Sequence, residues 1–481
     1  MLNLSKVLIS LLPIAIAIVV FLQPLENLSQ IAFASKEGYK TYLYDLAGRK
    51  TAQFDGRVYR SSPDGQKWIT QLDDSFQLVD RSGKKLSEFD ARELGFSPDG
   101  QRLFIRSTKN KLQVYDMQKQ RLIQLDETSV ELPEFSKNSQ RGLNFTENGV
   151  SLLDQTGRRV AQIPGRFIKL TSGFASDGAR FVLYRLNPES CDLFDASGQM
   201  ISRLIKQCGG ISADGKKFFS VTGSSDDPVL QMHNTFGKKV AQFSGLFPIF
   251  SPDRRLIVTS NLIGEKSSYL YTATGQQLAQ LKGTSARFSS NSQRILTVSD
   301  NTVYLYDRLG KEITRSPGSW AAFLPNSSKF TTFLYGESVY RSPAQLSGEG
   351  RLFDQTGRPL ALLKGNYGFE PLMDSATQGL NFPSSFTGDY NQNFSFISAD
   401  GQRLGTSDSR VSYLYDSSGQ QIAELQGIAV KFSPTGKHLI TTSEDKVYLY
   451  DRSGTKLAEI QGDNGSFSLD GQRVVVTVRN R

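Results

Sequence analysis

An internal repeat is the feature that most constrains this chain. Two short phrases alternate along most of the 481 residues: an aromatic or aliphatic residue, Asp, two variable residues and Gly, and then Phe-Ser-Pro-Asp-Gly or a relative of it. In the cleanest copies the closing glycines of successive phrases are 17 or 18 residues apart, so one unit spans about 35 residues. A period of this length indicates stacked supersecondary units.

The composition of the repeat decides between helices and strands. Helical repeats can share this length, but turn-forming Asp-Gly pairs every 17 or 18 residues leave no stretch for paired amphipathic helices. The runs between turns, such as Lys446–Tyr450 and Arg473–Val478, are rich in β-branched and aromatic residues and predict short strands. Four such strands form a small sheet that is apolar on both faces and must be sandwiched between neighbours. The sequence therefore predicts an all-β propeller with four-stranded blades.

The number of repeats raises the question of one ring or two. Eleven positions carry the first phrase, and Gly365–Ser395 is a candidate for a twelfth blade. Because propellers usually have roughly four to eight blades, this count favours two tandem propellers over one large ring. We place one group of blades in 35–225 and the other in 226–481, although no Pro- or Gly-rich linker marks that boundary. The chain begins with a third-strand segment and ends with a second-strand segment, so strands from both termini are expected to complete one blade.

The best copies resemble a known family. Residues 414–443 and 449–478 are similar to WD40 repeats, and the likeness extends in weaker form from about Tyr42 to Val478. In that family the third strand ends in Trp-Asp, and a Gly-His pair helps to tie each blade through a buried network. Here neither His233 nor His438 follows a Gly in that position. Propellers that resemble the periplasmic TolB protein, with Ser-Pro-Asp-Gly turns, are our second choice of family. Tyrosine stands where the WD40 family has tryptophan at Tyr44, Tyr115, Tyr306, Tyr415 and Tyr450.

The N-terminal 34 residues form a separate segment. Lys6 precedes an uncharged, mostly apolar run, Val7–Leu22, and the small residues Ala32 and Ala34 follow after a polar stretch. This order predicts a secretory signal peptide that is cleaved after Ala34. A helix over the apolar run would span about 24 Å, short of the roughly 30 Å of a bilayer core. The alternative is an uncleaved signal anchor through residues 7–22. We therefore expect an exported protein, periplasmic or extracellular, or a membrane-anchored one.

The charge balance indicates the chemistry of a partner. The chain has 56 Lys and Arg against 47 Asp and Glu, a net charge of +9 that removal of residues 1–34 leaves unchanged. A basic protein favours anionic partners, and we expect a protein or an acidic polymer; nucleic acid is not expected outside the cell. Basic residues follow many of the turns, and the two kinds of turn in a four-stranded meander emerge on one side. Their common role is to blunt sheet edges and maintain solubility. The alternative is a basic docking face, whose candidate residues are Lys84, Lys85, Lys238, Lys239, Arg254 and Arg255.

Few residues could carry catalysis or bind a metal. Two histidines and two cysteines exclude His-cluster metal sites, zinc modules and a disulfide-rich scaffold. The repeated aspartates are predicted to cap turns. We therefore predict no catalytic residue, no metal site and no cofactor. Cys191 and Cys208 are 17 residues apart, and an exported protein permits a disulfide between them, but this spacing alone leaves the bridged and the free forms open.

These observations favour a non-enzymatic propeller that acts as a scaffold for protein interactions. The rival hypothesis is an exported propeller hydrolase that uses carboxylates in its central channel. The sequence does not indicate the oligomeric state of the protein.

Overall fold

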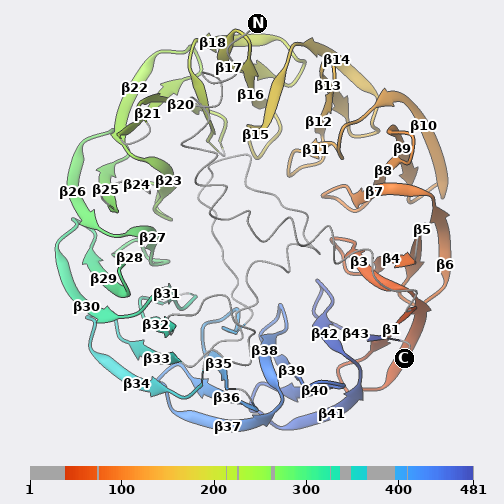
Figure 1. The fold of residues 1–481 in the computed structure, drawn as a ribbon, viewed down its shortest axis with the longest axis vertical. Coiled ribbons are helices and arrows are strands. Elements are labelled where there is room, and N and C mark those ends of the chain that lie inside the picture. Colours follow the sequence, from red (N-terminus) through yellow and green to blue (C-terminus); the bar gives the residue numbers. More distant parts are fainter. Residues whose placement is uncertain are drawn as a thin grey trace, which may run out of the picture.

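The structure, a computed structural model, describes residues 38–479 except 73–74, 213, 225–226, 262–265, 326, 336–347, 366–395 and 409. The signal segment, residues 1–34, lies outside the described residues. Every regular element in the described part is a strand, and the strands form eleven sheets arranged around one axis (Figure 1). The predicted all-β propeller with eleven blades is thus confirmed. Apart from Gly365, the candidate twelfth blade lies outside the described residues.

We number the blades from the first complete sheet. Blade 1 holds β3 (Arg57–Ser61), β4 (Lys67–Leu72), β5 (Ser75–Asp80) and β6 (Lys85–Phe89); blade 2 holds β7 (Ala91–Phe96), β8 (Arg102–Ser107), β9 (Lys111–Asp116) and β10 (Arg121–Thr128). Blade 3 holds β11 (Glu134–Phe135), β12 (Arg141–Thr146), β13 (Gly149–Asp154) and β14 (Arg159–Pro164); blade 4 holds β15 (Phe167–Phe174), β16 (Arg180–Leu186), β17 (Glu189–Asp195) and β18 (Met200–Leu204). Blade 5 holds β19 (Gln207–Ile211), β20 (Lys217–Gly223), β21 (Pro228–Asn234) and β22 (Lys239–Ser244); blade 6 holds β23 (Leu246–Phe250), β24 (Leu256–Asn261), β25 (Ser267–Thr272) and β26 (Gln277–Lys282).

The remaining blades complete the ring. Blade 7 holds β27 (Thr284–Phe288), β28 (Arg294–Ser299), β29 (Thr302–Asp307) and β30 (Glu312–Pro317); blade 8 holds β31 (Trp320–Phe323), β32 (Phe330–Tyr335), β33 (Gly348–Phe353) and β34 (Pro359–Leu363). Blade 9 has three described strands, β35 (Arg403–Ser407), β36 (Val411–Asp416) and β37 (Gln421–Gln426), and blade 10 holds β38 (Ile428–Phe432), β39 (His438–Thr442), β40 (Lys446–Asp451) and β41 (Lys456–Gln461). Blade 11 combines β42 (Asn464–Phe467) and β43 (Val474–Arg479) with β1 (Tyr39–Tyr44) and β2 (Lys50–Asp55).

Both ends of the chain share blade 11. Strand β1 pairs with β43 from Tyr39 opposite Arg479 to Tyr44 opposite Val474, and it pairs with β2 on its other edge. The predicted completion of one blade by strands from both termini is confirmed. Because the chain closes on itself only here, the sheets form one ring, as Figure 1 shows.

The preference for two tandem propellers is therefore corrected. The proposed division at 225/226 falls between β20 and β21, which pair with each other in blade 5. The core also continues through this region, since buried clusters join blade 4 to blade 5 and blade 5 to blade 6. Each blade needs an apolar neighbour on both sides. One closed ring gives two such neighbours to every one of the eleven blades.

Tyrosine and threonine tie each of several blades to the blade before it. The hydroxyl of Tyr306 in blade 7 accepts a hydrogen bond from the Lys282 amide at the end of blade 6, at 3.0 Å, and the Thr297 hydroxyl donates to the Lys282 carbonyl. We call this arrangement the tyrosine clasp. In the same way, the Tyr271 hydroxyl accepts from the Ser244 amide and the Tyr415 hydroxyl accepts from the Lys364 amide. Of the tyrosines at the position of the WD40 tryptophan, Tyr306, Tyr415 and Tyr450 thus bond to the backbone of the preceding outer strand.

Candidate docking face

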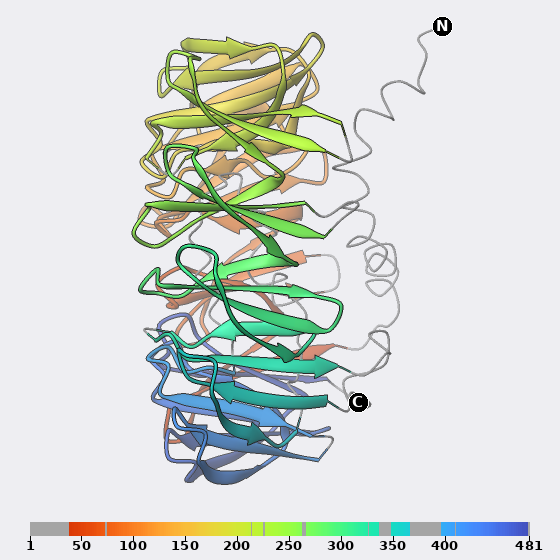
Figure 2. The same ribbon diagram turned by 90° about the vertical axis from the view of Figure 1, so that its left-hand side faces the viewer.

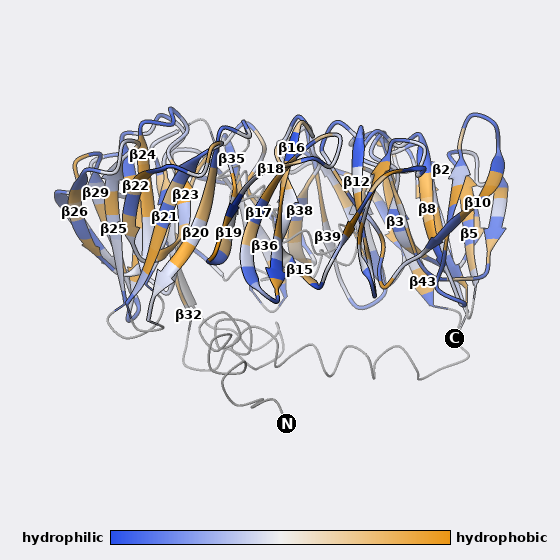
Figure 3. Ribbon diagram, turned by 90° about the horizontal axis from the view of Figure 1, so that it is seen from above, coloured by the Kyte–Doolittle hydropathy of each residue, from blue (hydrophilic) through white to orange (hydrophobic). Residues whose placement is uncertain are grey.

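The turns that carry the repeat phrases lie on one face of the ring. The first turn of each blade joins its first and second strands, and the third turn joins its third and fourth strands. Turns of neighbouring blades touch each other: Asp253 pairs with Arg308 at 3.4 Å, and Asp400 pairs with Arg452 at 3.1 Å. We call this side the turn face and the opposite side the loop face. The ring is a flat disc (Figure 2), and in Figure 3 the end of β43 lies below it, so the turn face points upward.

The aspartates of the turns direct their carboxylates at their own backbone. Asp451 accepts hydrogen bonds from the amides of Ser453 and Thr455, at 2.8 and 2.9 Å, and from the Ser453 hydroxyl at 2.6 Å. Gly454 completes this turn with a φ of +86°, a conformation that favours glycine. Although burial alone would raise the pKa of Asp451, these hydrogen bonds hold that pKa below its ordinary value. The predicted turn-capping role is confirmed.

This geometry makes the turn face present cations. The turn carboxylates are engaged with amide and hydroxyl groups and in some turns with an arginine, such as Arg308 or Arg452, whereas other lysine and arginine side chains of these turns are exposed without an ion pair in the described part of the chain. The structure places all six candidate docking residues on this face, and all six are exposed. The candidates are Lys84 and Lys85 in the third turn of blade 1, Lys238 and Lys239 in the third turn of blade 5, and Arg254 and Arg255 in the first turn of blade 6.

The six residues do not form one site, which corrects the sequence-based grouping. In Figure 1 the turn between β5 and β6 lies on the other side of the ring from blades 5 and 6. A separation across the ring far exceeds the screening length of about 8 Å at physiological salt. Lys85 also pairs with Glu88 at 2.9 Å, whereas no salt bridge within the described residues involves Lys238, Lys239, Arg254 or Arg255. Blades 5 and 6 therefore hold the compact part of the candidate surface.

Other basic residues after the first turn are latches between blades. Arg141 donates from Nε to the Ala196 carbonyl of the next blade at 2.7 Å. Arg294 donates from Nε to the Gln355 carbonyl at 2.9 Å. Arg403 donates from Nε to the Arg452 carbonyl at 3.2 Å. These side chains stabilise the packing of neighbouring turns and are not available for docking.

Two of the third turns on this face carry a large exposed apolar side chain that was not among the predicted site residues. In six blades the residue before the glycine of the third turn is Ser or Thr, whose hydroxyl donates to the turn aspartate at 2.6 Å. Blade 5 has Phe236 at this position and blade 7 has Leu309, and they are 85% and 65% exposed. An alignment of the first phrases with one another would have shown the exchange.

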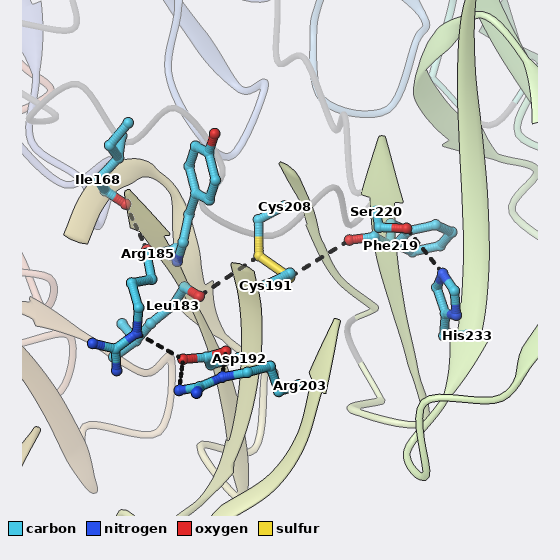
Figure 4. Close-up of a disulfide and its surroundings, with 12 residues drawn as sticks. Ile168, Leu183, Arg185, Cys191, Asp192, Arg203, Cys208, Phe219, Ser220 and His233 are labelled. Carbon is cyan, nitrogen blue, oxygen red and sulfur yellow. Dashed lines mark hydrogen bonds and ion pairs between the residues drawn. A yellow bond between two sulfur atoms is a disulfide. The ribbon is translucent and has the colours of Figure 1, made fainter. Parts of the chain in front are cut away.

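Cys191 and Cys208 form a disulfide, with Cα atoms 4.7 Å apart (Figure 4). The bond joins β17 of blade 4 to β19 of blade 5, and both cysteines are fully buried. Beside it the buried Asp192 lies between Arg203, at 2.8 Å, and Arg185, at 3.2 Å. Burial alone would raise the pKa of Asp192, but hydrogen bonds from Arg203, Ser190 and Arg185 hold it below the ordinary value. The ion pairs join β16, β17 and β18 within blade 4, and the disulfide joins that blade to blade 5.

Ser220 and His233 lie 2.9 Å apart, in the arrangement of a nucleophile and its base. Both are buried, and His233 occupies in blade 5 the position of Tyr306 in blade 7, while Ser220 occupies that of Thr297. The pair thus occupies the positions of the tyrosine clasp, but its described hydrogen bonds stay within blade 5 (Figure 4). Within the described ranges no group of three His, Cys, Asp or Glu residues is placed to hold a metal ion.

No helix in the described part of the chain is long and apolar enough to cross a membrane.

Comparisons with known proteins agree with this architecture. The family model for the WD domain, G-beta repeat, matches residues 275–307. Similar solved structures include a crystal structure of the eukaryotic initiation factor, with 14% identity, a TM-score of 0.44, and coverage of 68% of this chain and 96% of that chain. Another is the Dos1 propeller, with 15% identity, a TM-score of 0.34, and coverage of 58% and 89%. No curated protein matches the sequence. The chain thus carries a WD40 repeat within a closed ring of eleven β-propeller blades.

Proposed function

We propose that this protein is a non-enzymatic interaction scaffold that works outside the cytoplasm and docks an acidic protein or an acidic polymer on its turn face. The observation that carries the proposal is the asymmetry of the turns: their carboxylates bind their own backbone, while the cations of blades 5 and 6 extend into solvent. WD40 propellers commonly bind proteins, which supports a protein partner. Electrostatic complementarity would speed association and select acidic partners.

The positions of the chain ends fit this role. Tyr39 starts β1 on the loop face, where it pairs with Arg479, and β1 then runs toward the turn face. A chain that kept residues 1–34 as an anchor would have its loop face toward that membrane and its turn face toward the surrounding space. A chain cleaved after Ala34 would diffuse freely with the same surface. In both forms the turn face remains accessible to a partner.

The docking role is tested by capture from the compartment into which the cell exports the chain. The chain without residues 1–34 serves as bait, and the affinity of each captured protein or polymer is then measured at several salt concentrations. We expect affinity to fall steeply with salt and to fall on charge reversal by Lys238→Glu with Lys239→Glu. The matched control is Lys84→Glu with Lys85→Glu, on the other side of the ring, which should leave affinity nearly unchanged. A partner that is indifferent to salt and to both variants would place binding on the loop face or in the channel.

Export itself is tested by N-terminal sequencing of the chain recovered from the cell. The expected first residue is Ser35. Recovery of Met1 in the membrane fraction would establish the anchored form.

A further inference from the structure

Two side chains on the turn face have no role within the ring. Phe236 and Leu309 replace the hydroxyl residues that support the turn aspartate in six other blades. The exchange gives up a hydrogen bond and gains no burial, since the two side chains are 85% and 65% exposed. Single exposed apolar side chains are common on protein surfaces, but these two share one repeat position at which six other blades have a hydroxyl that bonds the turn aspartate. We call Phe236 and Leu309 the apolar tips.

The repeat places both apolar tips at one level of the disc. Each stands one residue before the glycine of a third turn, Phe236 between β21 and β22 and Leu309 between β29 and β30 (Figure 1). Equivalent turns of a closed ring lie at the same height, so the two tips point away from the same face. Blade 6 stands between them with a smaller side chain, Thr274, at the same position. The arrangement fits a planar partner that touches both tips at once.

Cations form an arc between and around the tips. Lys238 and Lys239 follow Phe236 in the same turn, and the exposed Lys311 follows Leu309. The first turn of blade 6 lies between the two. Burial would raise the pKa of Asp214 in blade 5, but hydrogen bonds from Ser212 and Lys216 and the charges of Lys216 and Arg254 hold that pKa below its ordinary value. Asp253 pairs with Arg308, beside Leu309, at 3.4 Å. Apolar side chains surrounded by lysine and arginine suit the boundary between anionic headgroups and acyl chains.

We propose that blades 5 to 7 of the turn face bind an anionic lipid bilayer, with Phe236 and Leu309 entering the interface and the surrounding cations contacting the headgroups. Exposed side chains at turn tips suit a bilayer better than they suit a small ligand, which needs a concave site. Cavities of about 350 Å³ and 680 Å³ are lined by second-turn residues such as Asp300 and Lys109, and they belong to the loop side of the molecule.

This inference goes beyond the docking of an acidic protein or polymer, and it applies to the chain cleaved after Ala34. In that form nothing ties the loop face to a membrane, and the turn face is free to lie on one. Bilayer binding would leave the loop face exposed to soluble partners.

The test uses vesicles and the chain without residues 1–34, whose closed ring of strands runs from Tyr39 to Arg479 and is therefore complete. We expect the protein to sediment with vesicles of phosphatidylcholine that contain about a third phosphatidylserine, and not with phosphatidylcholine alone. Added salt should weaken the binding, because headgroup attraction is screened. Absence of binding to anionic vesicles at low salt would overturn the proposal.

The apolar tips are tested by Phe236→Thr with Leu309→Thr. Threonine occupies this position in blades 3 and 8, so the variant should fold and support the turn aspartate as those blades do. We expect its affinity for anionic vesicles to fall by about tenfold or more, since the apolar area buried in the interface is lost. The matched control is Leu362→Thr in β34 on the outer rim, where Leu362 is 63% exposed. Equal binding by the tip variant and the wild type would overturn the insertion of the tips.

A direct measurement uses Phe236→Trp. Its indole fluorescence should shift to the blue with anionic vesicles and be quenched by lipids that carry a quencher on the acyl chain. Soluble polyglutamate separates this inference from the proposed docking role. If polyglutamate binds and the vesicles do not, the bilayer proposal fails and the docking of acidic partners stands.

Discussion

At the scale of single residues, the tyrosine clasp explains how this ring does without the Trp and His network of WD40 repeats. The Tyr306 hydroxyl reaches the amide at the end of the preceding outer strand, where it satisfies a backbone donor close to the interface between blades. Thr297 satisfies the carbonyl of the same residue, Lys282. Two side chains of one blade thus fix the end of the outer strand of the blade before it.

This role predicts the effect of Tyr306→Phe. Removing the hydroxyl leaves the Lys282 amide without this partner and should lower the free energy of unfolding by about 1 to 2 kcal/mol. Hydrogen exchange should be faster at the Lys282 amide, and urea unfolding measures the stability. Tyr304→Phe is the matched control, because Tyr304 lies on the same face of β29, with its ring 6.3 Å from that of Tyr306, while the bond to the Lys282 amide is made by Tyr306. Equal exchange at Lys282 in the wild type and in Tyr306→Phe would contradict the clasp.

His233 makes the buried Ser220–His233 pair of blade 5 sensitive to pH. Burial lowers the pKa of His233 in the folded chain below the ordinary value of 6.5. Nδ1 faces the Gly237 carbonyl at 3.2 Å and carries the proton, so Nε2 accepts from Ser220. As the pH falls below about 6.5, the unfolded chain takes up a proton that the folded chain refuses until its own lower pKa is reached. The stabilisation is thus complete above pH 6.5 and decreases on acidification.

The prediction is tested with His233→Phe, since Phe194 and Phe353 occupy this position in blades 4 and 8. The variant loses the bond to Ser220 at every pH but no longer titrates. The melting temperature of the wild type should therefore fall relative to that of the variant between pH 7.5 and 5.5. His438, whose pKa burial also lowers, is present in both proteins and cancels in the difference. A constant difference in melting temperature across this range would show that His233 keeps its ordinary pKa.

At the scale of elements, the disulfide joins two blades, whereas the hydrogen bonds of the sheets hold the strands within each blade. It connects the third strand of blade 4 to the first strand of blade 5 across a sequence separation of 17 residues. A loop of about this length is associated with a stabilisation of about 3 kcal/mol by restriction of the unfolded chain.

We therefore expect Cys191→Val with Cys208→Ala to lower the free energy of unfolding by about 3 kcal/mol. Valine occupies the equivalent position in blade 7, as Val303, so the exchange keeps an apolar contact. The measurement is urea unfolding of the double variant and of the wild type, with and without reductant. Reductant should shift the wild type toward the variant and leave the variant unchanged. Equal midpoints for all four samples would mean that the bond is not formed or does not stabilise the fold.

The sequence predicts elements here far better than it predicts contacts between them. Aspartate and glycine at fixed offsets specify turns by local chemistry, so the strands of blades 1, 10 and 11 are readable from one copy of the repeat. The latches from Arg141 and Arg294 cross from blade to blade, and a search along the sequence sees only basic residues after turns. Local patterns carry no information on which turn stands next to which.

At the scale of the whole molecule, the same limit explains the error in ring number. Eleven repeat units can form one ring or two tandem propellers. Which of them forms depends on pairing between strands from opposite ends of the chain. The candidate docking residues show a related limit: the sequence assigns them to one face, but only the ring reveals that the turn between β5 and β6 lies across from the turn between β21 and β22 (Figure 1). The repeat determines which face of the ring carries the basic residues. The closure of the ring determines which of those residues lie close enough to form one site.

Closure also predicts the effect of removing the first hairpin. Strand β1 pairs with β43 over six residues and with β2 on its other edge, so blade 11 loses half of its strands when residues 35–56 are deleted. The deletion exposes the edge of β43, and an exposed edge favours pairing with other chains. We expect the truncated chain to self-associate, and the amides of Val476 and Val478 to exchange fast while those of blade 5 keep their protection.

The control is the chain that begins at Ser35, which keeps the whole ring and should remain protected at Val476. A synthetic peptide of residues 38–56 supplies β1 and β2 in trans, and it should restore protection at Val476 and suppress self-association in proportion to its concentration. Restoration requires that blade 11 is a site where two separate segments assemble, since a peptide could not repair a blade built from consecutive residues. Slow exchange at Val476 in the truncated chain without the peptide would show that the ring does not depend on β1 for closure.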